Sequence, residues 1–187
     1  MIKYFILMFL IISVNGYSPV DNLEINKYIG RWYQVYQDLA DTIFEGKSTC
    51  IIADYGLKND STISVVNSET TVKGDLQQIR GIAYYQDGNS GGELTVKLGL
   101  LPPAPYWVID LGPIINDQYQ YSIVSDNKKK SLFVLARNVS EFFKKYDDLV
   151  LDTLEDFNFI NFLNKPIKSN QDNCTYPKVV WQDILKV

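Results

Sequence analysis

The chain of 187 residues is 46% hydrophobic and 21% charged, which is enough apolar material for one domain with a substantial core rather than two. Its formal net charge of -4 at pH 7 predicts an acidic surface that repels phosphate backbones, so we expect no nucleic-acid partner. Because the chain has no histidine, a Ser-His-Asp triad and a His-ligated zinc site are excluded, and we expect no metal and no cofactor.

The first 16 residues have the pattern of a secretory signal peptide. Lys3 precedes an apolar stretch from Tyr4 to Val14, and small residues follow where a signal peptidase would cleave, ending at Gly16. The apolar stretch is too short for a membrane-spanning helix, which needs about 20 residues, and no similar run recurs later. The sequence therefore predicts a signal peptide over residues 1–16, a single secreted domain over residues 17–187, and no membrane anchor.

From Gly30 to Asn138 the sequence alternates between β-prone runs and short turn-forming segments, which is typical of an antiparallel sheet or barrel. Connections of hairpin length favour strands that run up and down in chain order. The expected strands are Gly30–Asp38, Thr49–Gly56, Thr62–Asn67, Leu76–Gln86, Glu93–Leu98, Tyr106–Asp110, Tyr119–Ser125 and Leu132–Arg137. The predicted fold class is all-β, an eight-stranded up-and-down antiparallel barrel over about residues 30–138.

After Arg137 the apolar residues recur at helical spacing, among them Phe142, Phe143, Tyr146 and Leu149. This spacing predicts one C-terminal α-helix over about residues 140–155. A single apolar stripe beside a barrel is expected to pack against the outer wall. The tail, over about residues 156–187, is expected to be mostly irregular.

Two cysteines, Cys50 and Cys174, lie far apart in the sequence. In an oxidising compartment an even pair most simply forms one disulfide. Such a bond would close a loop of about 125 residues and contribute roughly 3–5 kcal/mol in the chain-entropy model.

Three Asn-x-Ser/Thr triplets begin at Asn59, Asn138 and Asn173. Each is an acceptor sequence for N-glycosylation in a secreted protein. These asparagines are therefore glycosylation candidates, provided that the host cell glycosylates.

Several segments resemble the signature segments of a known family, the lipocalins. A Gly-x-Trp motif, formed by Gly30 and Trp32, opens the first predicted strand, and Arg137 ends the last. Across nearly all of the predicted secreted domain the chain resembles the apolipoprotein D and bacterial outer-membrane lipocalin branch. The loop Gly112–Tyr119 is longer than the family's turn at this place. The matching segments are Leu23–Tyr33, Phe44–Gly46, Ala104–Trp107, Leu135–Arg137 and Asp172–Cys174.

The resemblance implies the roles of three residues at the closed end of the barrel. In lipocalins the Trp of the first strand stacks under the Arg that ends the last strand, which here pairs Trp32 with Arg137 through a cation–π contact. Gly30 lets the chain turn tightly into the first strand. We interpret Gly30, Trp32 and Arg137 as structural rather than as ligand contacts. The tail cysteine of the family also supports the pairing of Cys50 with Cys174.

Strand alternation predicts which side chains face inward, because successive residues point to opposite faces. If Trp32 points inward, so do Gln34 and Tyr36, while Tyr33 and Val35 meet the helix outside; an inserted bulge residue would reverse the remainder of the strand. If Cys50 points outward, the next three inward positions are Ile51, Ala53 and Tyr55; if Arg137 points inward, so do Leu135 and Phe133. The resemblance adds Tyr106 at the mouth. The predicted ligand contacts are thus Tyr36, Ile51, Ala53, Tyr55, Tyr106, Phe133 and Leu135.

Arg80, in the predicted strand Leu76–Gln86, has two open interpretations. It could face inward and hold a carboxylate or phosphate of the ligand, which makes it a further candidate contact. It could equally be an exposed Arg on the outer face.

An apolar interior with phenolic edges suits an acyl chain, a lysophospholipid, a sterol or a similar molecule, and an eight-stranded barrel holds one small ligand. The first hypothesis is therefore a secreted, non-enzymatic carrier of one small hydrophobic ligand. The loops at the open end present Phe44, Leu100 and Leu101, which would serve as a lid or as a transient contact with a membrane or lipoprotein.

Two other hypotheses remain. The barrel could be a rigid scaffold whose loops bind another protein, since fold alone does not settle function. A lipid-modifying enzyme is the weakest hypothesis, because the chain lacks histidine and its acidic runs, at Asp147-Asp148 and from Asp152 to Asp156, fall on the predicted helix, where a solvated face is expected.

Overall fold

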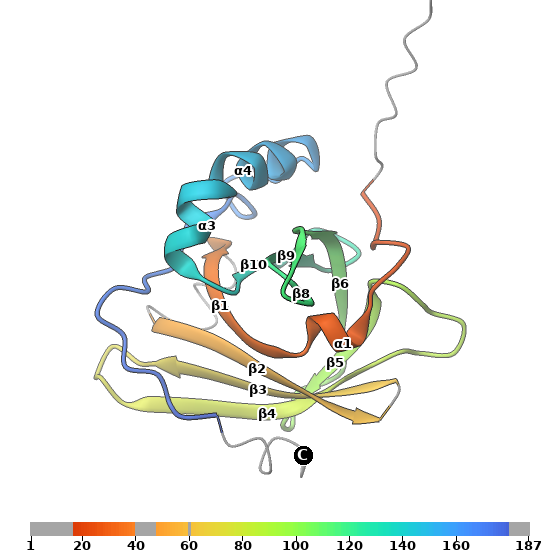
Figure 1. Ribbon diagram of the computed structural model, residues 1–187, viewed down its shortest axis with the longest axis horizontal. Helices are drawn as coiled ribbons and strands as arrows, with labels where there is room; N and C mark the ends of the chain where they lie inside the picture. Colours follow the sequence, from red (N-terminus) through yellow and green to blue (C-terminus); the bar gives the residue numbers. More distant parts are fainter. Residues whose placement is uncertain (1–16, 40–47, 60, 180–187) are drawn as a thin grey trace, which may run out of the picture.

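The computed structural model describes residues 17–39, 48–59 and 61–179 (Figure 1). The predicted signal peptide, the Phe44–Gly46 match and most of the first open-end loop lie outside the described residues.

Eight strands form a closed antiparallel barrel, so the predicted fold is confirmed. Each strand pairs with the next along the chain, and the last pairs with the first to close the sheet. Short turn-forming segments favour this pairing of consecutive strands, because they are long enough only for hairpin connections. The strands are β1 (Gly30–Gln37), β2 (Thr49–Asn59), β3 (Thr62–Thr70), β4 (Leu76–Tyr84), β5 (Glu93–Leu98), β6 (Ala104–Leu111), β9 (Tyr121–Ser125) and β10 (Leu132–Ala136).

A small separate hairpin interrupts the connection between β6 and β9. It consists of β7 (Ile114–Ile115) and β8 (Gln118–Tyr119), and the residues between them, Asn116 and Asp117, both have positive φ angles, which suits a tight turn. The strand predicted to begin at Tyr119 therefore begins at Tyr121. A short helix, α1 (Ile25–Tyr28), precedes β1 at the same end of the barrel.

The predicted C-terminal helix is present as two segments. α3 (Val139–Lys145) and α4 (Asp147–Asp156) meet at Tyr146, whose φ of -124° departs from helical geometry. The side chain of Asn138 caps α3 by accepting a hydrogen bond from the backbone N–H of Glu141. Both helices lie outside the barrel wall (Figure 1). Within the described part of the chain, no helix is long and apolar enough to cross a membrane.

The barrel wall separates two apolar clusters. The inner cluster fills the barrel from its closed end and is built on Trp32, Tyr55 and Val108. The outer cluster packs α3 and α4 against the other face of β1, β9 and β10, with Phe142 and Val150 at its centre. Alternation along the strands supplies both faces with apolar side chains.

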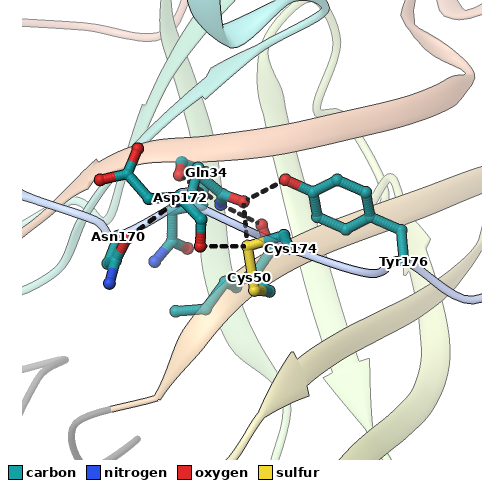
Figure 2. Close-up of a disulfide and its surroundings, with 8 residues drawn as sticks. Gln34, Cys50, Asn170, Asp172, Cys174 and Tyr176 are labelled. Carbon is teal, nitrogen blue, oxygen red and sulfur yellow. Dashed lines mark hydrogen bonds between the residues drawn. A yellow bond between two sulfur atoms is a disulfide. The ribbon is translucent and has the colours of Figure 1, made fainter.

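The tail is mostly irregular over residues 157–179, as its sequence predicts, and is held against the barrel. β11 (Ile167–Lys168) pairs with the end of β1, and the predicted disulfide between Cys50 and Cys174 is present, with Cα atoms 5.4 Å apart (Figure 2). Beside it, the Gln171 side-chain amide donates to the carbonyls of Gln34 and Ile51, both at 2.8 Å. The tail is thus fastened across β1 and β2 by covalent and hydrogen bonds.

Candidate ligand-binding site inside the barrel

The closed end of the barrel is held by Arg137 and Trp32. The Arg137 guanidinium carbon lies 3.6 Å from the Trp32 ring centroid, and Trp32 is fully buried. The guanidinium N–H groups donate to the carbonyls of Lys27, Tyr28, Ile29, Arg31 and Tyr119 at 2.8–3.2 Å. Burial lowers the pKa of Arg137 to about 10, so the group stays charged at neutral pH. This stacking and these bonds join α1, β1, β8 and β10.

Gly30 is required at this end for a steric reason. Its φ is +105°, a backbone conformation that L side chains rarely adopt, and a Cβ placed there would lie 3.0 Å from Arg137 Nη1. A side chain at Gly30 would therefore displace the guanidinium that covers Trp32.

A chain of four hydroxyl groups crosses the interior just above this floor. The Tyr28 hydroxyl lies 3.0 Å from that of Ser122 and 2.8 Å from that of Tyr106, which in turn lies 3.0 Å from the Tyr55 hydroxyl. Burial raises the pKa of Tyr28 to about 12 and raises the pKa values of Tyr55 and Tyr106 above the ordinary value. All three phenols are therefore neutral at physiological pH.

The inner face becomes more accessible with distance from the closed end. Leu94 and Val108 are almost completely buried, whereas Val96, Leu98 and Phe133 pack against the same inner cluster and remain partly exposed. Because the surrounding sheet closes on itself, partial exposure of an inward side chain indicates access from the open end. The inner face therefore offers apolar surface above a hydroxyl-bearing floor.

The structure brings most of the predicted ligand contacts together. Ala53, Tyr55 and Leu135 belong to the inner cluster, and Tyr106 and Phe133 pack against it. Ile51 is buried and lies two residues before Ala53 on β2, with its carbonyl bound by Gln171. That these residues contact a ligand stays a prediction.

Tyr36 does not line the interior, so its assignment as a ligand contact is wrong. A bulge between Gln34 and Tyr36 in the β1–β10 pairing adds one residue to β1 and turns Tyr36 outward. Its ring packs edge-on against the rings of Phe142 and Phe143, and its hydroxyl donates to Asp147 Oδ1 at 2.8 Å. Tyr36 therefore attaches the helices to the wall.

Arg80 lies on the outer face, so its assignment as a ligand contact is also wrong. Its neighbour Gly81 pairs with Val65, a residue of the inner cluster, and Arg80 consequently points the other way, opposite Val66. Its side chain is exposed. The outer-face interpretation of Arg80 is the correct one.

Tyr106 was expected at the mouth of the barrel, but it lies deeper. Its hydroxyl reaches Tyr28 of α1, which packs beside Trp32 at the closed end, with ring centroids 5.3 Å apart. The depth of Tyr106 depends on α1, a four-residue helix that the sequence pattern did not predict.

Sequence reasoning predicted the inward direction of Gln34 but missed three other polar residues of the interior, Tyr28, Ser122 and Gln37. Tyr28 and Ser122 belong to the hydroxyl chain, and Gln34 and Gln37 face inward opposite Leu135 and Phe133, joined by a 2.7 Å hydrogen bond. Ser122 could have been found by alternation, because it lies two residues before the inward-facing Val124. Gln37 could not, because its orientation depends on the bulge.

Other predicted surface features can also be placed. Asn59, Asn138 and Asn173 are exposed, and so are Leu100 and Leu101 at the open end, whereas Phe44 lies outside the described residues. Over residues 17–39, 48–59 and 61–179, no group of three or more His, Cys, Asp or Glu side chains lies close enough to hold a metal ion.

Comparisons with known proteins agree on one family. A family model described as a lipocalin-like domain matches residues 23–155. Apolipoprotein D of Cavia porcellus is 39% identical over 90 residues, which cover 48% of this chain and 46% of the relative. The outer membrane lipoprotein Blc of Vibrio cholerae is 32% identical over 121 residues, which cover 64% of this chain and 68% of the relative. The matches thus span about half the length of apolipoprotein D and two thirds of the bacterial protein.

Solved structures share the fold at lower sequence identity. The amine binding protein of Rhodnius prolixus, solved as a tryptamine complex, superposes with a TM-score of 0.62 at 18% identity. The superposition covers 92% of this chain and 94% of that chain. At this identity the likeness concerns the fold of the barrel.

Proposed function

The chain belongs to the lipocalin-like family, and from this premise we propose that it is a secreted carrier that binds one small hydrophobic ligand inside the barrel. The ligand class is a fatty acid, lysophospholipid, sterol or similar molecule, and the role is transport or lipid handling. Secretion is proposed from the signal-peptide pattern of residues 1–16 and agrees with the disulfide, which forms in oxidising compartments.

One observation carries the proposal: apolar side chains on the inner face remain partly exposed. Val96, Leu98 and Phe133 come from two strands, β5 and β10, and all pack against the inner cluster. Each methylene of an acyl chain buried there would contribute about 0.8 kcal/mol. After association costs of several kcal/mol, a chain of about 16 carbons supports micromolar binding or better.

The relatives support the same class of ligand. The Rhodnius prolixus protein is an amine binding protein solved with tryptamine, and japanin from Rhipicephalus appendiculatus, a second protein of this fold, was solved with cholesterol bound. Both ligands are small and have a substantial apolar part, which is the property that the inner face of this barrel would recognise.

The competing function is a protein-binding scaffold. Two loops at the open end carry exposed apolar side chains, which favour contact with another molecule at that end. These side chains are Val72 and Leu76 at one loop and Leu100 and Leu101 at the other. Such contact with a membrane or lipoprotein would also suit a carrier that loads its ligand at the open end. A lipid-modifying enzyme finds no support in the hydroxyl chain, because its phenols lack a neighbouring histidine to activate them.

Binding experiments separate these functions. Lipid extraction of the purified full chain followed by mass spectrometry tests for a co-purified ligand, and titration with a fluorescent fatty acid measures affinity. We expect saturable one-to-one binding that Phe133→Asp abolishes, because a carboxylate would then enter the apolar interior. The control is Phe162→Asp, which makes the same substitution in the tail, at a position 72% accessible to solvent.

The outcomes of these experiments are distinct. Saturable binding that is unaffected by Phe133→Asp, in a variant with a wild-type circular dichroism spectrum, would place the ligand outside the barrel. Absence of both co-purified lipid and binding across a lipid panel would favour the scaffold.

A further inference from the structure

The hydroxyl chain on the barrel floor has one more hydrogen-bond donor than its internal bonds use. Its four members, Ser122, Tyr28, Tyr106 and Tyr55, each carry one hydroxyl proton and are joined in a row by three hydrogen bonds. Each bond consumes one proton, so one of the four is left over in every arrangement of the chain. When the hydroxyls rotate and reverse the direction of a bond, a different member has the spare proton, and the number of internal hydrogen bonds stays at three.

Two members can present the spare proton to a ligand. Tyr28 is completely buried, whereas Tyr106 is partly exposed on the inner face and Tyr55 retains 5% of its accessible surface. Because the Tyr55 and Tyr106 hydroxyls lie 3.0 Å apart, an acceptor atom placed against one lies within reach of the other. Tyr106 is therefore the most exposed member of the chain, and it shares the one available donor with Tyr55 beside it.

The cationic side chains around this pair direct their N–H donors away from it. Arg31, Arg80 and Lys97 lie on the outer face of the sheet, because their neighbours Trp32, Gly81 and Val96 lie on the inner face. The guanidinium of Arg137 lies behind Trp32 and directs its N–H groups to five backbone carbonyls. A buried carboxylate requires several donors or a paired cation.

The inner face of β3 adds a negative group nearer the open end. Glu69 lies two residues beyond Asn67 and four beyond Val65, which belongs to the inner cluster, so alternation places Glu69 on the same face. An anionic ligand head that reaches the floor would have passed this carboxylate and would find there the single spare phenol donor. A single neutral oxygen needs only that donor.

We propose that Tyr55 and Tyr106 form a polar subsite that binds one neutral oxygen acceptor, a ketone or hydroxyl oxygen, at the closed end of the barrel. The ligand enters oxygen first, and its apolar body lies along Val96, Leu98 and Phe133 toward the open end. This inference rests on the proposed function and narrows its ligand class to neutral, oxygen-bearing lipids. It predicts that such ligands bind more tightly than carboxylates of the same length.

The test compares two probes of equal chain length at pH 7.4, 2-dodecanone and dodecanoate, by displacement of a fluorescent apolar reporter from the full chain. We expect the ketone to bind more tightly than the carboxylate. The carbonyl stretching frequency of bound 2-dodecanone, measured by infrared difference spectroscopy, should shift downward because the oxygen accepts a hydrogen bond.

Variants locate the donor. The double variant Tyr55→Phe/Tyr106→Phe should weaken ketone binding by about twofold to tenfold, the effect of one neutral hydrogen bond, and should abolish the infrared shift. Each single variant should lose less than the double, because the remaining phenol then holds the spare proton. The matched control is Tyr121→Phe, which removes a buried phenol whose hydroxyl bonds Asp110 on the outer side of the wall.

Each outcome either supports or overturns the inference. It is overturned if the folded double variant retains wild-type affinity and the infrared shift, or if dodecanoate binds as tightly as the ketone. If neither probe nor any lipid displaces the reporter, the proposed function itself fails. Thermal melting of every variant separates loss of binding from loss of folding.

Discussion

The two faces of the barrel wall are both apolar, yet they differ in what covers them. On the outer face, α3 and α4 bury Val35, Ile123 and Val134 almost completely, and the packing uses aromatic edges and one phenol–carboxylate hydrogen bond. On the inner face, burial is complete at the floor and partial toward the open end. The difference shows that the chain supplies its own partner for one face and leaves the upper part of the other accessible.

The largest expected effect is at the floor of the inner face. Trp32→Ala should lower the free energy of unfolding by about 3–5 kcal/mol, because it removes a fully buried ring and the surface on which Arg137 stacks. Denaturant unfolding measures this change. Ligand affinity of the fraction that stays folded should change far less; a variant that melts like the wild type yet fails to bind would mean that Trp32 belongs to the binding site.

Removal of the disulfide should have the next largest effect. Cys50→Ser/Cys174→Ser opens a loop that spans 124 residues and should lower stability by about 2–5 kcal/mol. Gln171 would still hold the tail to Gln34 and Ile51 by hydrogen bonds, so we expect the folded barrel and its ligand affinity to persist. The measurement is thermal unfolding with and without ligand. Unchanged stability would show that the disulfide adds little to the tail's own contacts.

A smaller effect distinguishes the two faces at a single residue. Tyr36→Phe removes the hydrogen bond to Asp147 and should lower stability by about 1 kcal/mol without changing ligand affinity, because the ring packs against Phe142 and Phe143 outside the barrel. Chemical denaturation and ligand titration of the same preparation measure both quantities. A fall in affinity at unchanged stability would return Tyr36 to the interior, where simple alternation had put it.

Simple alternation succeeds where a strand is anchored and uninterrupted. The order of the eight strands and the inward position of Leu135 could be predicted because Leu135 lies two residues from the Arg137 anchor on a regular ladder. Ala53 and Tyr55 were also predicted correctly, although a register shift between Thr49 and Ile52 lies beside their anchor, Cys50. The direction of Tyr36 could not be predicted, because the bulge beside it arises where β1 pairs with β10 and the tail, partners more than 90 residues away. Local sequence carries no signal for such a distant constraint.

Arg80 and Tyr106 illustrate two other limits. The strand that contains Arg80 offers no residue whose direction is known in advance, so its two faces could be told apart only from the pairing with β3. The direction of Tyr106 was predicted but its depth was not, because depth is set by the contact with Tyr28 across 78 residues of sequence. The hydroxyl chain is consequently a property of the closed barrel and not of any one segment.

The central claim, that the ligand binds on the inner face, is tested most directly by methyl NMR on β10. Leu135 and Val134 are adjacent on this strand and point to opposite sides of the wall, Leu135 into the inner cluster and Val134 toward the helices. In a full chain labelled at Leu and Val methyl groups and titrated with a small hydrophobic ligand, we expect the resonances of Leu135, Val96 and Leu98 to shift saturably and those of Val134 and Leu132 to stay in place. Shifts confined to Val134 and Leu132, or to the exposed Leu100 and Leu101, would contradict binding inside the barrel.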